Sequence, residues 1–367
     1  MTSTKSPRDL KIIMVVGTRP NLVKAAPVYD ALVQHKGVEV LIAHTGQHYD
    51  PNMDCDVARS LGLPSPTWQS STSKIGYEGT RVWLRDIFRR CKPDAVIVIG
   101  DVDSTYHAAM AGRDASCAII HVESGLRSGD TTMPEERNRI AVDKIAHLLL
   151  ATEQSGVDNL QMEGVPGRIE LVGSFTVDAL VRQLPRADAD TILREMKLQP
   201  RSYALATIHR QSNVDSLAAL QRIVELLQTA IDESGLAVVW PIHPRTRKRI
   251  DEFSVRLPAG NLQLCEPVDY TRFIKLMKEA ALILTDSGGI QEETTYLGIR
   301  CITFRDTTER PATILSGTND LLPDLAPDSL RLLLKKNKKA KPVEFWDGKA
   351  SQRAARCIID FLAATTG

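Results

Sequence analysis

Two glutamates lie at the two ends of one βα connection, HVESGLRSGDTTMPEERNR, residues 121–139. Glu123 directly follows an apolar run, CAIIHV, that is typical of a buried strand. Glu135 lies at the expected start of the next helix. Carboxylates placed on two sides of a substrate can act as general acid and general base. The connection is therefore a candidate for proton-transfer chemistry.

Each glutamate also has a structural alternative. Glu123 could form a buried salt bridge with Arg127 or Arg139. Thr132-Met133-Pro134-Glu135 has the form of a capping box, in which Glu135 would bond the start of its own helix. Glu135 and Arg139 are four residues apart and would share one helical face.

A third carboxylate follows the preceding expected strand. In VIGDVDST, residues 98–105, Asp101 leaves the strand at its carboxyl end. Asp103 or Ser104 can cap the next helix, and helix capping is the alternative role of both aspartates. Capping explains Asp101 less well, because this residue precedes the capping position.

Two cations follow the first expected strand. GTRPNLVKAAP, residues 17–27, combines a turn glycine, Gly17, with a proline suited to a first helical turn. Arg19 and Lys24 would stand near a helix N-terminus, where backbone amides already favour an anion. The alternative is a plain turn with two solvated cations.

The second half contains a candidate diphosphate site, LTDSGGIQEETTYLG, residues 284–298. Gly288 and Gly289 would let a diphosphate approach the amides of a helix start, and Ser287 adds a hydroxyl donor. Glu293 could accept hydrogen bonds from ribose. An ordinary capped helix does not explain two adjacent glycines. The chain lacks GxGxxG and Walker A motifs, so binding of NAD and hydrolysis of ATP lose support.

Further basic side chains follow other strands of this half. His209, in TIHRQSN, could meet a phosphate, and His243, in WPIHP, repeats the pattern. Either histidine could instead be a hydrogen-bonded structural residue. Arg305 and Arg310 belong to a polar loop, RDTTERPATILSGT, that could also face an anion.

Short β-branched apolar runs alternate with amphipathic stretches along the chain, as in parallel sheets covered on both faces. The pattern predicts α/β architecture with two doubly wound, Rossmann-like domains facing a cleft. We place the domains at residues 1–185 and 186–350, with the polar stretch 187–202 as the linker region. The amphipathic helix 351–367 is expected to pack back on the N-terminal domain, although its pattern fits either one. The expected strands are residues 11–17, 38–44, 95–100, 117–122, 147–151, 168–173, 203–209, 236–243, 261–267, 281–286 and 300–304.

Composition narrows the function classes. The net charge of +1 provides no broad cationic field for nucleic acid or anionic lipid. The start of the chain lacks an apolar signal region, and no stretch is long and apolar enough for a membrane span, so we expect a cytoplasmic protein. The cysteines show no metal-binding spacing, and reduced thiols without a bound metal are expected. They are Cys55, Cys91, Cys117, Cys265, Cys301 and Cys357.

Seven motifs in a fixed order closely resemble the UDP-N-acetylglucosamine 2-epimerase family. They are GTRP, GD, HVESGLR, PEERNR, HR, TDSGGIQEE and RDTTERP, and they span about residues 11–320. The resemblance implies a fold of the GT-B glycosyltransferase type, a homodimer, and interconversion of UDP-GlcNAc and UDP-ManNAc without a redox cofactor. It also implies the route: UDP is eliminated as a proton leaves C2, and UDP then re-adds to 2-acetamidoglucal as a proton arrives on the opposite face.

The resemblance also assigns residues to roles. It implies Asp101, Glu123 and Glu135 as the acid/base and cation-stabilising set, without saying which carboxylate serves which face of C2. It places His209, Arg19 and Lys24 on the diphosphate side, and it implies that His209 is a catalytic residue. The implied substrate-binding residues are Arg19, Lys24, Arg139, His243, Phe273 (uracil), Ser287, Gly288, Gly289 (diphosphate) and Glu293 (ribose).

Departures from the family pattern leave alternatives open. Gln211 follows His209-Arg210 where many bacterial members have a second arginine, in a region that binds an activating UDP-GlcNAc in some members. Substituents of the sugar could differ, as in a diacetamido uronic acid. A hydrolysing epimerase that releases UDP and ManNAc is the main alternative, followed by a GT-B glycosyltransferase and a non-catalytic nucleotide-sugar sensor.

Overall fold

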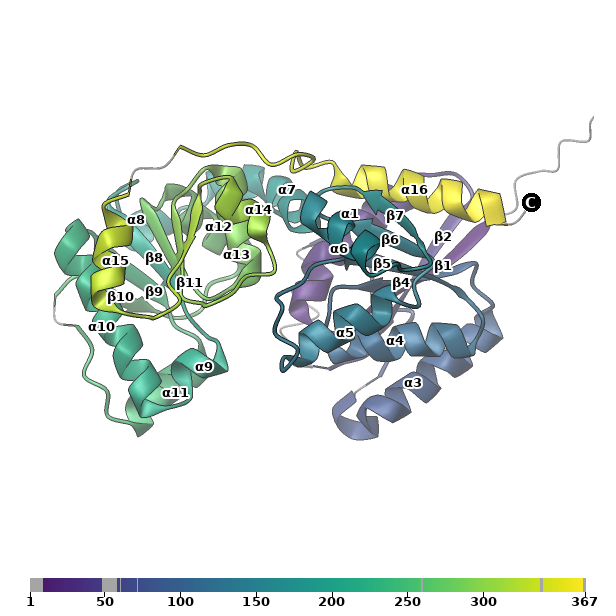
Figure 1. Ribbon diagram of the computed structural model, residues 1–367, viewed down its shortest axis with the longest axis horizontal. Helices are drawn as coiled ribbons and strands as arrows, with labels where there is room; N and C mark the ends of the chain where they lie inside the picture. The colour runs from purple at the N-terminus through teal and green to yellow at the C-terminus, as the bar shows by residue number, and fades with distance from the viewer. Residues whose placement is uncertain are drawn as a thin grey trace, which may run out of the picture. The chain divides into compact units, whose positions relative to one another are not determined.

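Two parallel β-sheets, each with its own helices, organise the chain (Figure 1). The computed structural model describes residues 9–47, 58–59, 61–70, 72–258, 260–336 and 339–365, so Cys55 lies outside the described residues. The chain divides into unit 1, within residues 1–179 and 344–367, and unit 2, within residues 180–343. It passes from one to the other inside helix α7 (Phe175–Ala189).

Unit 1 contains a seven-stranded parallel sheet in the order β3-β2-β1-β4-β5-β6-β7. The six strands predicted from apolar runs in this half are confirmed, and β4 is buried along its whole length. The two-residue strand β3 was not predicted. The strands are β1 (Leu10–Val16), β2 (Val38–His44), β3 (Trp68–Gln69), β4 (Ala95–Ile99), β5 (Ala118–Ser124), β6 (Leu148–Ala151) and β7 (Arg168–Leu171).

Unit 2 contains a six-stranded parallel sheet in the order β10-β9-β8-β11-β12-β13. Its five predicted strands are confirmed, whereas β13, which directly follows the predicted polar loop 305–318, was not predicted. The strands are β8 (Tyr203–Thr207), β9 (Ala237–Pro241), β10 (Leu262–Cys265), β11 (Leu282–Thr285), β12 (Cys301–Thr303) and β13 (Asn319–Leu321).

Helices connect the strands of both units. In unit 1 the C-terminal helix α16 packs beside α1, as Figure 1 shows in yellow and purple. No described helix has the length and apolar character needed to cross a membrane. The helices of unit 1 are α1 (Arg19–Val33), α3 (Thr72–Cys91), α4 (Asp103–Asp114), α5 (Pro134–Asp143), α6 (Gln154–Met162) and α16 (Ala350–Thr365). Those after α7 are α8 (Ile192–Glu195), α9 (Gln211–Val214), α10 (Leu217–Ser234), α11 (Pro244–Glu252), α12 (Tyr270–Glu279), α13 (Gly288–Leu297), α14 (Pro311–Leu315) and α15 (Pro327–Leu334).

The strand order reverses once in each sheet, at β1 and β4 in unit 1 and at β8 and β11 in unit 2. Ligands of open α/β sheets bind at the carboxyl ends of strands beside such a reversal. The turn after β1 lies close to α4 there, because a Cβ on Gly17 would stand 2.1 Å from Oγ of Ser104. The fold therefore brings most of the sequence-predicted side chains to these two edges.

Candidate active site

The turn after β1 is fixed by a buried asparagine that sequence reasoning missed. Oδ1 of Asn21 accepts a hydrogen bond from the Gly17 amide over 3.2 Å, and its Nδ2 donates to the Ile99 carbonyl over 3.0 Å. Asn21 therefore holds the start of α1 against the end of β4. Arg19 is the first residue of α1 and is half-buried, and Lys24 follows on the same helix.

Glu123 occupies an irregularity at the end of β5. The pairing of β5 with β6 shifts register between Val122 and Ser124, so Glu123 is an extra residue in its strand. Its φ of 70° lies in the left-handed region, which costs a non-glycine residue about 1–3 kcal/mol. Bulges beside active sites re-aim side chains. The buried Glu123 carboxylate is consequently directed by a strained backbone rather than by regular strand geometry.

Lys24 is the ion-pair partner of Glu123, through Nζ and Oε2. The salt bridge predicted as the alternative role of Glu123 thus involves Lys24, a residue that was not proposed as its partner. Arg127 pairs with Asp143, and Arg139 pairs with Asp101. The partner could not be read from sequence spacing, because Lys24 and Glu123 are 99 positions apart and meet through the order of the strands.

Asp101 and Glu123 lie at the carboxyl ends of β4 and β5, two strands that pair in the sheet. A Cβ on the intervening Gly100 would stand 3.3 Å from Oε2 of Glu123. Nε of Arg139 donates to Oδ2 of Asp101 over 2.9 Å, and Nδ2 of Asn138 donates to the Asp101 carbonyl over 2.9 Å. Helix α5 thus binds the turn that carries Asp101.

The predicted helix caps near these carboxylates are wrong. The N-cap of α4 is Val102, and neither Asp103 nor Ser104 caps it. Asp103 instead accepts a hydrogen bond from Asn138 over 3.0 Å. The backbone amide of Ser104 donates a hydrogen bond to Oε1 of Gln47 over 2.8 Å.

Glu135 is not part of a capping box. Helix α5 has Met133 as its N-cap, with no side-chain cap hydrogen bond. The Thr132 hydroxyl donates instead to Oδ1 of Asp130 over 2.6 Å. The residue predicted to cap α5 therefore forms a local hydrogen bond in the preceding turn. In the described part of the chain the half-buried Glu135 side chain makes no hydrogen bond or ion pair. Glu135 is thus available for another role.

The neighbouring Glu136 was not predicted and holds the loop before α5. Its carboxylate accepts hydrogen bonds from the Ser128 and Gly129 amides, each at 3.0 Å, and pairs with Arg139. Both Glu136 and Arg139 are buried. Arg139, predicted to bind substrate, therefore forms the link between this loop and Asp101.

In unit 2, His209 is held by a buried aspartate that was not singled out as its partner. The Asp286 carboxylate accepts hydrogen bonds from the His209 and Arg210 amides, over 3.0 and 2.8 Å. Nδ1 of His209 lies 3.2 Å from Oδ1 of Asp286, and the His209 side chain is 50% exposed. Asp286 therefore orients an exposed imidazole at the switch point between β8 and β11.

His243 interacts electrostatically with His209. It is the N-cap of α11, and its Nδ1 accepts a hydrogen bond from the Arg245 amide over 3.2 Å. Burial, followed by the charges of His209 and Arg245, lowers the pKa of His243. Gln211 is exposed at the start of α9, in the same part of unit 2.

The start of α13 provides backbone amides and an unused hydroxyl. Ser287 is the N-cap residue, but its side chain makes no cap hydrogen bond. Gly288 and Gly289 form the first turn and are half-buried. A Cβ on Gly288 would stand 2.7 Å from Nη1 of Arg310, so the glycine admits the guanidinium beside the helix start. Oε1 of Glu309 would be equally close, at 2.7 Å, so the anion-binding capacity of this place rests on the backbone amides of the helix start.

The arginines of the predicted anion-facing loop are buried and paired with carboxylates. Arg310 pairs with Glu292 over 2.9 Å and also with Glu309. Arg305 pairs with Glu309 over 2.8 Å. The pair of Arg310 with Glu292 joins the loop after β12 to α13.

Glu293 and Phe273 are largely enclosed. The hydroxyl of Tyr270 donates to Oε1 of Glu293 over 2.6 Å. Burial raises the pKa of Glu293 to about 8, an effect to which Glu292 adds and which the Tyr270 hydrogen bond opposes. Phe273 is half-buried and packs against the core formed by α12 and its neighbouring strands.

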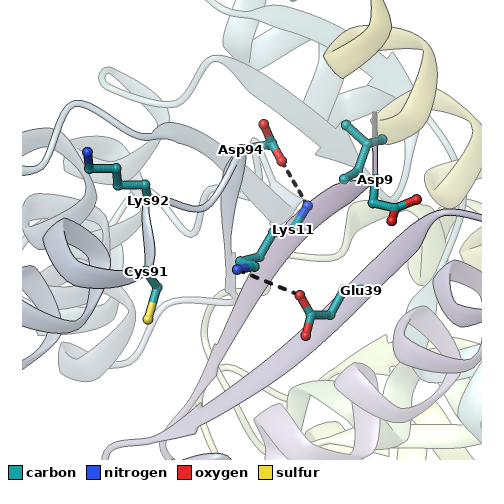
Figure 2. Close-up of a pocket in the computed structure, with 7 residues that line it drawn as sticks. Asp9, Lys11, Glu39, Cys91, Lys92 and Asp94 are labelled. Carbon is teal, nitrogen blue, oxygen red and sulfur yellow. Dashed lines mark hydrogen bonds and ion pairs between the residues drawn. The ribbon is translucent and has the colours of Figure 1, made fainter. Parts of the chain in front are cut away.

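A pocket of about 440 Å³ lies at the amino ends of the unit 1 strands, where β1, β2 and β4 begin (Figure 2). The Lys11 backbone amide donates a hydrogen bond to Oδ2 of Asp94 over 2.8 Å, and Nζ of Lys11 lies 3.9 Å from Oε2 of Glu39. The lining residues are Asp9, Leu10, Lys11, Glu39, Cys91, Lys92 and Asp94. None of the predicted site residues lines it.

Comparison with known proteins decides the family. Residues 30–359 match the family model described as UDP-N-acetylglucosamine 2-epimerase. The UDP-N-acetylglucosamine 2-epimerase of Methanocaldococcus jannaschii is 36% identical over 369 residues, covering 95% of this chain and 99% of that protein. The chain belongs to the UDP-N-acetylglucosamine 2-epimerase family. It is therefore an isomerase.

Solved structures confirm the predicted class of two doubly wound, GT-B-type domains. The crystal structure of the M. jannaschii epimerase in complex with UDP-GlcNAc and UDP has a TM-score of 0.86 at 35% identity, and covers 96% of this chain and 100% of that one. The structure of Acinetobacter baumannii MurG, at 14% identity and a TM-score of 0.53, shares the fold alone; it covers 98% of this chain and 100% of that one.

Another relative of the epimerase acts on a different sugar. The UDP-2,3-diacetamido-2,3-dideoxy-D-glucuronate 2-epimerase of Pseudomonas aeruginosa is 34% identical over 364 residues, which cover 95% of this chain and 99% of that protein. Family membership therefore establishes the epimerase class.

Proposed function

We propose that this epimerase interconverts UDP-GlcNAc and UDP-ManNAc without hydrolysis. A proton leaves C2 to a carboxylate, the bond between C1 and the diphosphate oxygen breaks, and UDP departs with the electron pair. Addition of UDP to C1 of 2-acetamidoglucal, with protonation of the opposite face of C2, completes the inversion. The C2 hydrogen is not acidified by an adjacent carbonyl, so stabilising the cationic sugar and the departing diphosphate is essential.

The observation that carries the proposal is the placement of two acidic residues at the carboxyl ends of the paired strands β4 and β5. Asp101 directly follows Gly100, and a Cβ placed on Gly100 would stand 3.3 Å from Oε2 of Glu123. Each carboxylate is held by a cation, Arg139 or Lys24. We assign these two carboxylates and Glu135 to proton transfer at C2 and to stabilising positive charge on the ring, because inversion requires an acid/base group for each face.

We assign the nucleotide to unit 2. His209, His243 and the start of α13 would bind the diphosphate, with Ser287, Gly288 and Gly289 as the contacts. Arg19 is implied by the family resemblance to contact the diphosphate. Glu293 would contact ribose and Phe273 the uracil face, as the family resemblance implies.

The decisive experiment is incubation of the enzyme with UDP-GlcNAc in D2O, followed by NMR. We expect UDP-ManNAc, deuterium at C2 of both epimers, and no free sugar. Free ManNAc would identify a hydrolysing epimerase instead. Turnover without incorporation of deuterium would reject the elimination route.

A second candidate substrate is the UDP-2,3-diacetamido uronic acid, which the P. aeruginosa relative is named for. Activity on this compound, with none on UDP-GlcNAc, would move the assignment to it. A homodimer, which the family resemblance implies, and a cytoplasmic location, which the sequence predicts, belong to the same proposal. Sedimentation velocity over a range of protein concentrations tests the dimer.

A further inference from the structure

A histidine buried behind the carboxylates has no place in the proposed reaction. His121 belongs to β5, two residues before Glu123, and its side chain is 0% exposed. Nδ1 lies 2.6 Å from Oδ1 of Asp143, which is also 0% exposed. Nε2 lies 2.8 Å from the carbonyl oxygen of Gly100. Both ring nitrogens are thus engaged.

The partners of the ring determine where its protons are. A carbonyl oxygen can only accept a hydrogen bond, so Nε2 must carry hydrogen. Asp143 also acts as an acceptor, because its Oδ2 accepts the Gly125 amide over 3.2 Å and lies 2.8 Å from Nη2 of Arg127. The Arg127 guanidinium beside Oδ2 favours the ionised form of Asp143 independently of His121. An ionised Asp143 requires hydrogen on Nδ1 as well.

The same two residues contact both turns that carry the carboxylates. Gly100, whose carbonyl binds the ring, has a φ of 68° and directly precedes Asp101. Gly125, whose amide binds Asp143, has a φ of 79° and follows Glu123 by two residues. Glu123 itself is in the left-handed region. Glycine adopts such φ values freely, but the conformation of Glu123 persists only where surrounding contacts hold it.

We propose that His121 is a buried imidazolium that, paired with Asp143, positions Asp101 and Glu123 by fixing the turns after β4 and β5. It is a positioning residue and not a catalytic one, because its Nε2 hydrogen is committed to a main-chain carbonyl. The protonation state of His121 does not depend on the proposed function. The expected effect on kcat does rest on that function.

NMR of protein with 15N-labelled histidine tests the protonation state, with His121→Gln used to assign the signal. We expect the two nearly equal ring-nitrogen shifts of an imidazolium at neutral pH. In Asp143→Asn the amide can donate to Nδ1, while its oxygen still accepts from Gly125 and Arg127. The ring should then become neutral, with two widely separated nitrogen shifts. A neutral ring in the wild-type enzyme would overturn the imidazolium.

Kinetics test the positioning role. In Asp143→Asn we expect kcat to fall about tenfold or more with KM within about twofold, since small displacements of catalytic groups cost rate rather than binding. His121→Gln should act in the same direction. The control is Glu163→Gln, which removes the other carboxylate partner of Arg127, at 2.8 Å, and should leave kcat unchanged. Wild-type kcat in both folded variants would overturn the positioning role. If the wild-type enzyme turned over no UDP-sugar, the proposed function would fail while the NMR result still stood.

Discussion

Arg139 of α5 donates a hydrogen bond from Nε to Oδ2 of Asp101 over 2.9 Å, and the same guanidinium pairs with Glu136. The Arg139 side chain is 3% exposed. One buried cation therefore connects the turn after β4 with the loop before α5. Its loss would leave the buried Glu136 carboxylate without its cation, a situation that proteins tolerate poorly.

Arg139→Met should lower the free energy of unfolding by about 3 kcal/mol, the scale for breaking a buried ion pair. Urea denaturation measures the change. The matched control is Arg81→Met in the same unit, because Arg81 and Asp114 pair over 2.7 Å with side chains 27% and 25% exposed. This control should cost at most about 1 kcal/mol. Equal losses in the two variants would show that burial of Arg139 adds nothing.

Glu135→Gln should fold normally yet lose at least about 10²-fold in turnover, the usual effect of removing an acid/base group. Its thermal stability should not change, because Glu135 takes no part in a helix cap. Glu136→Gln is the comparison: its carboxylate accepts two amide hydrogen bonds, so this variant should lose stability. Near-wild-type turnover in Glu135→Gln would remove Glu135 from the catalytic set.

Gly100→Ala should lower both stability and kcat. The φ of 68° costs an alanine about 1–2 kcal/mol, and the new Cβ would stand 3.3 Å from Oε2 of Glu123. Gly164→Ala provides the control, because its φ is 61° and no atom lies within 4 Å of the new Cβ. Both variants should lose similar stability in thermal unfolding, but only Gly100→Ala should lose turnover. A similar kcat in the two would separate Gly100 from the positioning of Glu123.

The pattern of apolar runs was enough to predict most strands, because parallel strands covered on both faces must be apolar throughout. It failed at β13, whose first two residues, Asn319 and Asp320, are polar and buried. Asn319 is stabilised by hydrogen bonds with Gln291 and Thr303, at 2.9 and 2.7 Å. Such partners depend on the finished fold, so hydropathy could not indicate this strand.

The same limit applies to the candidate site. Residues that follow strands were predictable in position, but not in partner. The Thr132 hydroxyl bonds Asp130 rather than capping α5. The sequence alone does not decide between these two local hydrogen bonds. His121 and Asn21 were missed because a polar residue within or beside an apolar run gives no sign of what it will bind.

Glu293 should make stability depend on pH. Its pKa is raised to about 8 in the folded protein, so the fold prefers the neutral acid. The stabilisation is complete below the ordinary glutamate pKa, declines as the unfolded chain ionises, and is lost as pH rises through about 8. The difference in unfolding free energy between wild-type enzyme and Glu293→Gln should therefore shift against the wild type between pH 5 and pH 8. Tyr270→Phe, which removes a hydrogen bond that lowers this pKa, should extend the decline to higher pH. A difference independent of pH would contradict the raised pKa.

Ser287→Ala should weaken UDP binding without lowering stability. The hydroxyl stands at the N-cap of α13 but makes no cap hydrogen bond, so the helix loses nothing when it is removed. Ser216→Ala is the reverse case, because Oγ of Ser216 accepts the Ala219 amide over 3.2 Å at the start of α10. That variant should lose about 1 kcal/mol of stability and keep its affinity for UDP. Titration calorimetry with UDP and urea denaturation of both variants separate the two roles. Unchanged UDP affinity in Ser287→Ala would exclude this hydroxyl from the diphosphate site.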